Sequence, residues 1–520
     1  MAAVNETPAA VPPAAPPRAK RPGVLERFAE WTSERSNPIV VRYARQQLRS
    51  RGFIILFSTV LGFATLFAIT VGATAAERSE GDAALTLFGL LAAIWAFAVW
   101  VFEPIAAFRA TANERDEKTW DLVRLTGLSP GRLIWGMFLA SVLQGLLYGA
   151  AIAPFLVMAY LLRGISLDEI LFVLFLIPVA GWCASAGAIF LGSVSSTKGA
   201  RNALGVLVAI VAGFIWFSTL TVWLNFDFTG HFVLSGLIDG PGVVLLSNFA
   251  VIWIGAMLVL GGTVLRHPAS NRSTAPRLYA WLVFLNGVVW SLFVGDPFIS
   301  EALTVAAFFG ALAAFLLGIF AITEDYTITP RQYRETRHMR PWQLPIIFAP
   351  GAARGRAAYL ALVAAIAAVV AVAYALDDGG GRLREPMVFT ILICAHGTLL
   401  ITICDAIARK TQRLDNPVMR RVLFVSVFAS LAFIGSVITS LAGDRDPIAA
   451  LTPIPGMWII ADRPGRFEEQ LLLIVIAGGA AALILLIQAI RGTTVLERTV
   501  ATKKAPEPVA TREPATEPAE

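Results

Sequence analysis

From residue 133 to residue 162 the chain reads LIWGMFLASVLQGLLYGAAIAPFLVMAYLL, thirty residues without a charged side chain. A helix needs about 20 apolar residues to cross the hydrocarbon layer of a membrane. Because the backbone must satisfy its own hydrogen bonds there, such a run predicts a membrane-spanning α-helix. The composition of the whole chain supports this prediction. Of its 520 residues, 57% are hydrophobic and 15% are charged, whereas soluble domains are about 25% charged. The sequence therefore predicts an all-α, polytopic integral membrane protein.

Similar uncharged runs recur along the chain and predict about twelve transmembrane helices. They are 53–76, 83–102, 133–162, 170–197, 202–226, 240–265, 278–295, 302–323, 357–376, 386–404, 422–443 and 471–490. The seventh and tenth runs are the shortest of the twelve. An even number of crossings places both ends of the chain on the same side of the membrane.

The basic residues indicate which side that is. All but seven of the 42 Lys and Arg residues fall in the two tails or in the loops on the side of the tails. The seven on the opposite side are Arg78, Arg163, Arg382, Arg384, Arg445, Arg463 and Arg466. Cytoplasmic loops of membrane proteins carry an excess of Lys and Arg, so both termini are predicted to be cytoplasmic. The same bias explains the net charge of +6 without a nucleic-acid partner.

Composition also divides the chain. Residues 1–36 are rich in Ala and Pro, and residues 492–520 are polar and rich in Pro, so both are predicted to be disordered cytoplasmic tails. Residues 37–265 contain six of the apolar runs, and residues 266–491 contain the other six. We therefore expect two six-span membrane domains, and the second is either a repeat of the first or an unrelated unit.

A short amphipathic helix is predicted ahead of the first span. Asn37-Pro38 is a favourable helix start, an N-cap residue followed by Pro, and Gly52 is expected to end the helix. The basic residues Arg42, Arg45 and Arg49 fall on one face, which favours a helix lying in the interface with its bases toward lipid headgroups. A plain basic flank of the first span is the alternative reading.

A second charged element follows the second span, where residues 113–136 read NERDEKTWDLVRLTGLSPGRLIWG. On a helix that begins near Glu114, acidic positions share one face and Leu and Val residues share another. Gly127 suits the end of this helix, and Ser129 with Pro130 suits the start of the next. The pattern predicts a short cytoplasmic helix turned sharply against a membrane helix. It is either a docking element or a solvated loop helix without a partner.

Two stretches resemble permease subunits of the ABC type-2 exporter class. Residues 37–54, NPIVVRYARQQLRSRGFI, look like the opening of such permeases, particularly those grouped with multicopper-enzyme maturation systems. The segment from Glu114 onward is similar to the family's coupling helix, an acidic cluster, a Thr, a leucine-rich turn, a second Thr and Leu-Ser-Pro. The residues that match or flank this pattern are Glu114, Asp116, Glu117, Thr119, Trp120, Asp121, Leu122, Leu125, Thr126, Leu128, Ser129 and Pro130. Lys118 departs from the pattern, because the family usually has Gly there.

The resemblance covers about residues 37–265 and implies a permease that docks on a separate ATPase subunit. That partner would bind ATP and Mg, and no cofactor is expected on this chain, which has no G-x-x-x-x-G-K-[ST] motif. A second permease copy and the lipid bilayer are further implied partners. The implied location is the cytoplasmic (inner) membrane of a bacterium. The resemblance does not explain the second half, because the usual permease ends after six spans.

Few other residues suggest chemistry. There is no H-E-x-x-H or G-x-S-x-G motif, and the four histidines are far apart, so no catalytic or metal site is predicted. His396, Thr402 and Asp405 form a candidate polar site within the tenth span. Glu103 and Asp405 are expected at cytoplasmic span ends, where they snorkel to the interface or pair with a neighbour such as Arg409.

Two other function classes stay open. A polytopic membrane enzyme or secondary carrier would need a cluster of ionisable residues within the spans. A non-transporting scaffold or assembly factor derived from a permease would fit the extra six spans and the departure at Lys118.

Overall fold

The long apolar runs form long helices. The computed structural model describes residues 38–74, 80–116, 128–162, 165–195, 197–225, 240–267, 270–294, 299–324, 332, 346–377, 385–410, 417–442, 451, 457, 459–460 and 467–502. Within these ranges the chain consists of helices and turns and contains no strand, which confirms the all-α prediction.

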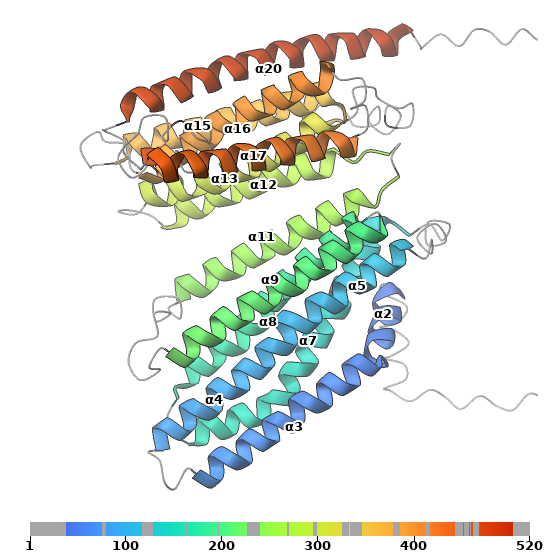
Figure 1. The fold of residues 1–520 in the computed structure, drawn as a ribbon, viewed down its shortest axis with the longest axis vertical. Helices are drawn as coiled ribbons and strands as arrows, with labels where there is room; N and C mark the ends of the chain where they lie inside the picture. Colours follow the sequence, from blue (N-terminus) through green and yellow to red (C-terminus); the bar gives the residue numbers. More distant parts are fainter. Residues whose placement is uncertain are drawn as a thin grey trace, which may run out of the picture.

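The helices of the first half are α2 (Pro38–Leu48), α3 (Arg51–Thr74), α4 (Glu80–Phe97), η1 (Ala98–Phe102), α5 (Glu103–Asp116), α7 (Pro130–Leu161), α8 (Leu167–Val194), α9 (Lys198–Asn225) and α11 (Gly240–Val264). Those of the second half are α12 (Thr274–Val294), α13 (Ile299–Thr323), η2 (Ile346–Phe348), α15 (Ala352–Ala375), α16 (Glu385–Lys410), α17 (Pro417–Ala442) and α20 (Glu468–Thr502). Figure 1 shows the two sets as two neighbouring groups of roughly parallel helices.

Ten helices within the described part of the chain are long and apolar enough to cross a membrane, so the protein is a multi-pass integral membrane protein. A long helix also occupies each of the other two predicted span positions. However, α12 and α17 are not among the ten, and α17 contributes only the shorter apolar stretch Ser426–Gly435. In α12, Arg277 and Asn286 interrupt the apolar sequence.

The second span continues further than its apolar run. The helices α4 and α5 are joined by η1, a single π-helical turn, and the continuous span covers Ala84–Glu114. Trp100 of η1 donates from Nε1 to the carbonyl of Ile177 in α8, 2.8 Å away. The prediction that Glu103 lies at a span end is therefore wrong, because helix continues for three turns beyond it and its side chain is 1% exposed.

The predicted end of the amphipathic helix is also wrong. The helix α2 ends at Leu48, and α3 already begins at Arg51, so Gly52 lies inside α3. The Ser50 hydroxyl explains the early start, since it accepts a hydrogen bond from the backbone N–H of Phe53 at 3.1 Å and caps the new helix. Arg49 consequently lies in the turn between the two helices rather than on α2.

Each group of helices has its own apolar interior. In the first group, Trp95, Tyr148 and Ile177 belong to a core shared by α3, α4, α7 and α8. In the second, Phe284 and Tyr359 belong to a core shared mainly by α12, α13, α15 and α16. Such close packing between membrane helices relies on shape, because lipid tails are as apolar as Leu.

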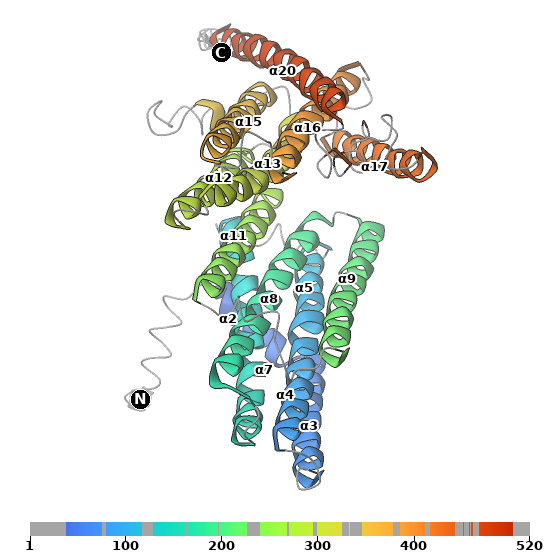
Figure 2. The ribbon, with the colours of Figure 1, turned by 90° about the vertical axis from the view of Figure 1, so that its left-hand side faces the viewer.

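The two groups meet along α11 and α12 (Figures 1 and 2). Asn248 and Asn286 exchange side-chain hydrogen bonds of 2.9 and 3.3 Å across this boundary. The Tyr279 hydroxyl donates to the carbonyl of Ile252 at 2.6 Å. A glycine is required beneath that ring, because a Cβ on Gly255 would lie 2.3 Å from the hydroxyl. These contacts fix α12 against α11; the division into domains 37–265 and 266–491 stays a prediction.

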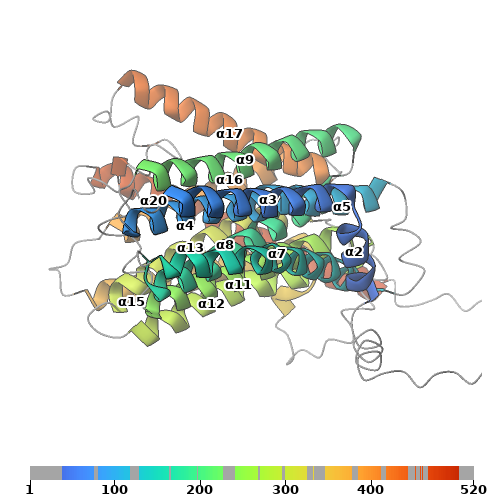
Figure 3. The same ribbon diagram turned by 90° about the horizontal axis from the view of Figure 1, so that it is seen from below.

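The described ends of the chain lie at one end of the helices. In Figures 1 and 3, α2 lies across the ends of the long helices instead of parallel to them. The last residues of α20 lie at that same end in Figure 1. The helix α20 continues past the predicted domain boundary at residue 491 to Thr502, since extending a formed helix is much easier than starting one.

Candidate functional site

The two motifs that carry the family resemblance lie against each other. Arg42 of α2 forms a 2.9 Å ion pair with Glu114, which lies in the last turn of α5. The Glu114 side chain is 11% exposed and that of Arg42 is 52% exposed. The partners are separated by 72 positions in the sequence, so the pair joins the predicted interfacial helix to the predicted coupling segment.

The amphipathic character of α2 is confirmed. Ile39 and Tyr43 are buried and belong to a core cluster with Leu133 and Ile134 of α7. The opposite side is basic, since Arg42, Arg45 and the following Arg49 are exposed. α2 therefore packs by its apolar face onto the start of α7, while Arg42 binds Glu114 at one edge and Arg45 stays exposed.

The far end of the coupling segment is described as well. Ser129 caps α7 by accepting a hydrogen bond from the backbone N–H of Arg132 at 3.4 Å, and Pro130 is the first helical residue, as predicted. Leu128 is partly buried against the cluster beneath α2. The described residues on either side of the segment therefore belong to the end of α5 and the start of α7.

The centre of this candidate site lies outside the described residues. It comprises Glu117, Thr119, Trp120, Asp121, Leu122, Leu125 and Thr126, together with Lys118 and Gly127. The side chain of Asp116 also lies outside them. The predicted helix over these residues therefore stays a prediction.

Sequence reasoning missed a buried polar cluster around Glu103. Glu103 follows η1 directly and faces α7 and α8. The Ser185 hydroxyl donates to its Oε1 at 3.2 Å. Its Oε2 has no hydrogen-bond partner among the described residues. A Cβ on Gly145 would lie 2.8 Å from this oxygen, so only glycine leaves room for the carboxyl group there.

Two further polar side chains extend the cluster. Gln144 donates from Nε2 to the Tyr148 hydroxyl at 3.2 Å, while its Oε1 has no partner in the described part of the chain. Trp182 Nε1 is likewise without a partner there, and it lies 3.4 Å from the point where a Gly145 Cβ would be. Buried polar atoms that lack partners are uncommon in proteins, and ionisable groups inside a membrane domain are functional candidates. The signal in the sequence was the single carboxylate of "VFEPI" between two apolar stretches.

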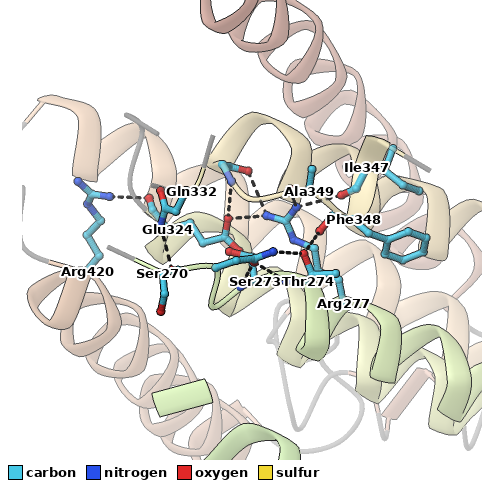
Figure 4. A network of polar contacts seen from close by, with 12 residues as sticks. Ser270, Ser273, Thr274, Arg277, Glu324, Gln332, Ile347, Phe348, Ala349 and Arg420 are labelled. Carbon is cyan, nitrogen blue, oxygen red and sulfur yellow. Dashed lines mark hydrogen bonds and ion pairs between the residues drawn. The ribbon is translucent and has the colours of Figure 1, made fainter. Parts of the chain in front are cut away.

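A larger polar network surrounds Arg277 in the first turn of α12 (Figure 4). Its guanidinium donates to the carbonyls of Ile347 and Gly351 at 2.9 and 3.0 Å, and also to that of Ala349. It forms an ion pair with Glu324. Arg277 therefore holds the turn before α15 against the end of α13.

Neighbouring residues complete this network. Arg420 of α17 donates to the Glu324 carbonyl at 2.9 Å, and the backbone N–H of Gly351 donates to the Glu324 side chain at 3.2 Å. The Thr274 hydroxyl donates to the carbonyl of Phe348 at 2.8 Å. With these partners, the arginine and the glutamate serve mainly to fix the ends of four helices.

The predicted polar site in α16 stays a prediction, and the structure shows what each of its three residues contacts. His396 Nδ1 lies 3.1 Å from the carbonyl of Leu392 in its own helix, and the Thr402 hydroxyl donates to the carbonyl of Thr398 at 2.7 Å. Asp405 instead forms a 2.7 Å ion pair with Arg356 of α15. The three residues have separate partners, which does not support a common ligand.

The Arg356–Asp405 pair also corrects an expectation about Asp405. Its side chain is fully buried, so it does not snorkel to the interface. The observed partner is Arg356, and the side chain of the suggested partner Arg409 lies outside the described residues. Arg356 lies near the start of α15 and Asp405 near the end of α16, so only the packing of these two helices brings the charges together.

Within the described ranges, no three His, Cys, Asp or Glu residues are grouped as metal ligands would be. Comparisons of the chain with protein-family models, curated proteins and solved structures gave no match.

Proposed function

We propose that the chain is the membrane-spanning permease subunit of an ATP-driven ABC-type exporter. In this proposal the chain crosses the cytoplasmic (inner) membrane twelve times, with both ends in the cytoplasm. A separate ATPase subunit binds ATP and Mg and docks on the segment between α5 and α7. The proposal rests on the resemblance of residues 37–54 and 114–130 to such permeases.

The observation that carries the proposal is the contact between the two motifs. The Arg42–Glu114 pair places α2 beside the end of α5, and α2 packs on the first turns of α7. A partner bound to the segment 117–127 would therefore push on two membrane helices at once, because the segment is joined directly to both. This is the connection that a docked ATPase needs to move the spans.

Isolation of the full chain from native membranes tests the proposal. We expect a P-loop ATPase to copurify, and we expect Glu117→Arg to lower its yield at least tenfold. Asp168→Arg is a matched control, because Asp168 lies in the first turn of α8, at the opposite end of the helices from the docking segment. A preparation in which the intact chain never carries an ATPase, or in which both variants retain one equally, would contradict the proposal.

A charge exchange tests the role of the ion pair. Arg42→Glu and Glu114→Arg should each weaken ATPase binding, and the double exchange should restore it. Exposed ion pairs contribute only about 0–1 kcal/mol to stability, so the fold should survive all three variants. Failure of the double exchange to recover binding would show that the pair does not position the docking segment.

The buried Glu103 favours a second candidate, a carrier driven by a proton gradient. Proteoliposomes that contain only this chain and a pH-sensitive dye distinguish the two. A carrier should take up protons when a gradient is imposed, and Glu103→Gln should abolish that uptake. The permease proposed first should show no such flux in the absence of its ATPase.

A further inference from the structure

A cavity of about 710 Å³ opens between α5 and α9 at the end of the helices that carries α2. Figure 2 shows α9 at the edge of the first group, beside α5. The cavity is lined by Ile105, Phe108, Arg109, Ala112, Asn113, Lys198, Arg201, Asn202, Gly205, Val206 and Ala209.

The polar and apolar lining residues are separated along the helices. Arg109 and Asn113 lie toward the end of α5, and Lys198 and Arg201 lie in the first turn of α9. Deeper in the membrane the lining becomes apolar. On α5 the cavity lining changes from Arg109 to Ile105, one helical turn deeper. On α9 the lining changes to Val206, about 12 Å below Lys198, and to Ala209, about 17 Å below it, at 1.5 Å per residue.

The charge of the cavity is positive. Three of its lining residues are cationic, and none of the described lining residues is acidic. Arg109 and Lys198 form no ion pair within the described part of the chain. The N-terminus of α9 adds the positive end of a helix dipole, which also favours an anion. Glu114, the nearest described acidic side chain along α5, is bound to Arg42.

The cavity is open toward the surrounding lipid. Val206 is 58% exposed although it lines the cavity, and Ile210 one turn further along α9 is 63% exposed. At its base, Phe108 is buried and a Cβ on Gly205 would lie 3.1 Å from its ring. A molecule could therefore enter sideways from the membrane but could not pass through between the helices.

We infer that this cavity binds an anionic phospholipid. The headgroup phosphate lies between Arg109, Lys198 and Arg201, and the first part of an acyl chain lies along Ile105, Val206 and Ala209. A free phosphate would use the basic end alone, whereas a zwitterionic lipid would bring a positive charge next to the three cations. Basic pockets between membrane helices on the cytoplasmic side are suited to such headgroups. The inference does not depend on the proposed transport function.

Native mass spectrometry of the full chain, purified in detergent and titrated with phosphatidylglycerol, phosphatidylcholine or inorganic phosphate, tests the inference. We expect phosphatidylglycerol to remain bound at concentrations where phosphatidylcholine does not. The double variant Arg109→Gln/Lys198→Gln should weaken this binding about 25-fold, at roughly a factor of five per charge. Arg51→Gln is the matched control, because Arg51 is an exposed basic residue at the start of α3 that does not line the cavity.

A second pair of variants tests the apolar part of the cavity and leaves all its charged residues unchanged. Val206→Trp should fill the groove and reduce phosphatidylglycerol binding, whereas Leu207→Trp should not, because Leu207 is exposed on the same helix but outside the cavity lining. Equal losses in Arg51→Gln and in the double variant would overturn the inference in favour of general attraction to basic flanks. Displacement of the lipid by an equal concentration of inorganic phosphate, with Val206→Trp without effect, would overturn it in favour of a free-anion site.

Discussion

Removal of the Asp405 carboxylate should destabilise the second group of helices strongly. Arg356 and Asp405 join α15 to α16 through a 2.7 Å ion pair, and their side chains are 3% and 0% exposed. In Asp405→Ala the guanidinium loses this counter-charge but stays in the interior. Breaking a buried pair in this way typically costs about 3–5 kcal/mol, and we expect a loss of stability in that range.

The double variant Arg356→Met/Asp405→Leu separates charge from packing. The two apolar side chains fill about the same space and carry no charge. Replacing a buried ion pair in this way often leaves the stability of a protein unchanged or raises it by about 1–4 kcal/mol. We therefore expect the double variant to be at least as stable as the natural protein. Arg42→Ala is a useful comparison, because it breaks an ion pair whose arginine is 52% exposed and should cost at most about 1 kcal/mol.

The measurement is equilibrium unfolding of the full chain in mixed micelles with increasing SDS, followed by tryptophan fluorescence. The reasoning would be refuted if Asp405→Ala unfolded within about 1 kcal/mol of the natural protein, since the uncompensated charge should cost about three times as much. It would also be refuted if the double variant were as unstable as the single one. The loss would then come from packing instead of from an unpaired charge.

Three further changes test the packing and the helix ends, each by the same unfolding measurement. Gly192→Ala should cost about 1–3 kcal/mol, because the new Cβ would lie 2.9 Å from the carbonyl oxygen of Phe108; Gly213→Ala, with nothing within 4 Å, should be neutral or slightly stabilising. Gly351→Ala should cost about 1–3 kcal/mol, since Gly351 has φ 122° beside the Arg277 network; unchanged stability would contradict this. Ser129→Ala removes the cap of α7 and should cost about 1 kcal/mol, whereas Ser129→Asp, which keeps an acceptor, should not.

The positions of the helices could be predicted well from sequence because a lipid bilayer permits few backbone conformations. Apolar runs longer than about 20 residues must be helical in lipid, and every predicted run coincides with a long helix. Local capping rules likewise predicted the start of α7 at Pro130. Where two such rules competed, the prediction failed: Gly52 suited a helix end, but the Ser50 cap starts α3 before it.

The buried polar contacts could not be predicted in the same way. Arg42 and Glu114, like Arg356 and Asp405, are partners only because separate helices pack side by side, and no local pattern encodes such pairs. Glu103 illustrates a related failure. Because it is charged, Glu103 was predicted at the end of a span, near the membrane surface. In the structure the helix continues past it, and Gly145 leaves space for the carboxyl group in the interior.

The π-helical turn η1 sets the rotational phase between α4 and α5. The residues buried along this helix, among them Trp95, Val99, Glu103, Ala107 and Thr111, follow at intervals of four. In an unbroken α-helix each such step drifts by about 40°, so the buried side would gradually turn toward lipid. The wider turn takes up part of this drift and keeps both halves of the helix facing α8. If the residues Ala98–Phe102 were wound as a regular α-helix with none removed, the extra residue that the π-helical turn absorbs would rotate α5 by up to about 100° relative to α4. Glu103, Phe108 and the lining of the α5–α9 cavity would then all change direction together, so this one turn acts as a common alignment point for the buried carboxylate and the basic cavity.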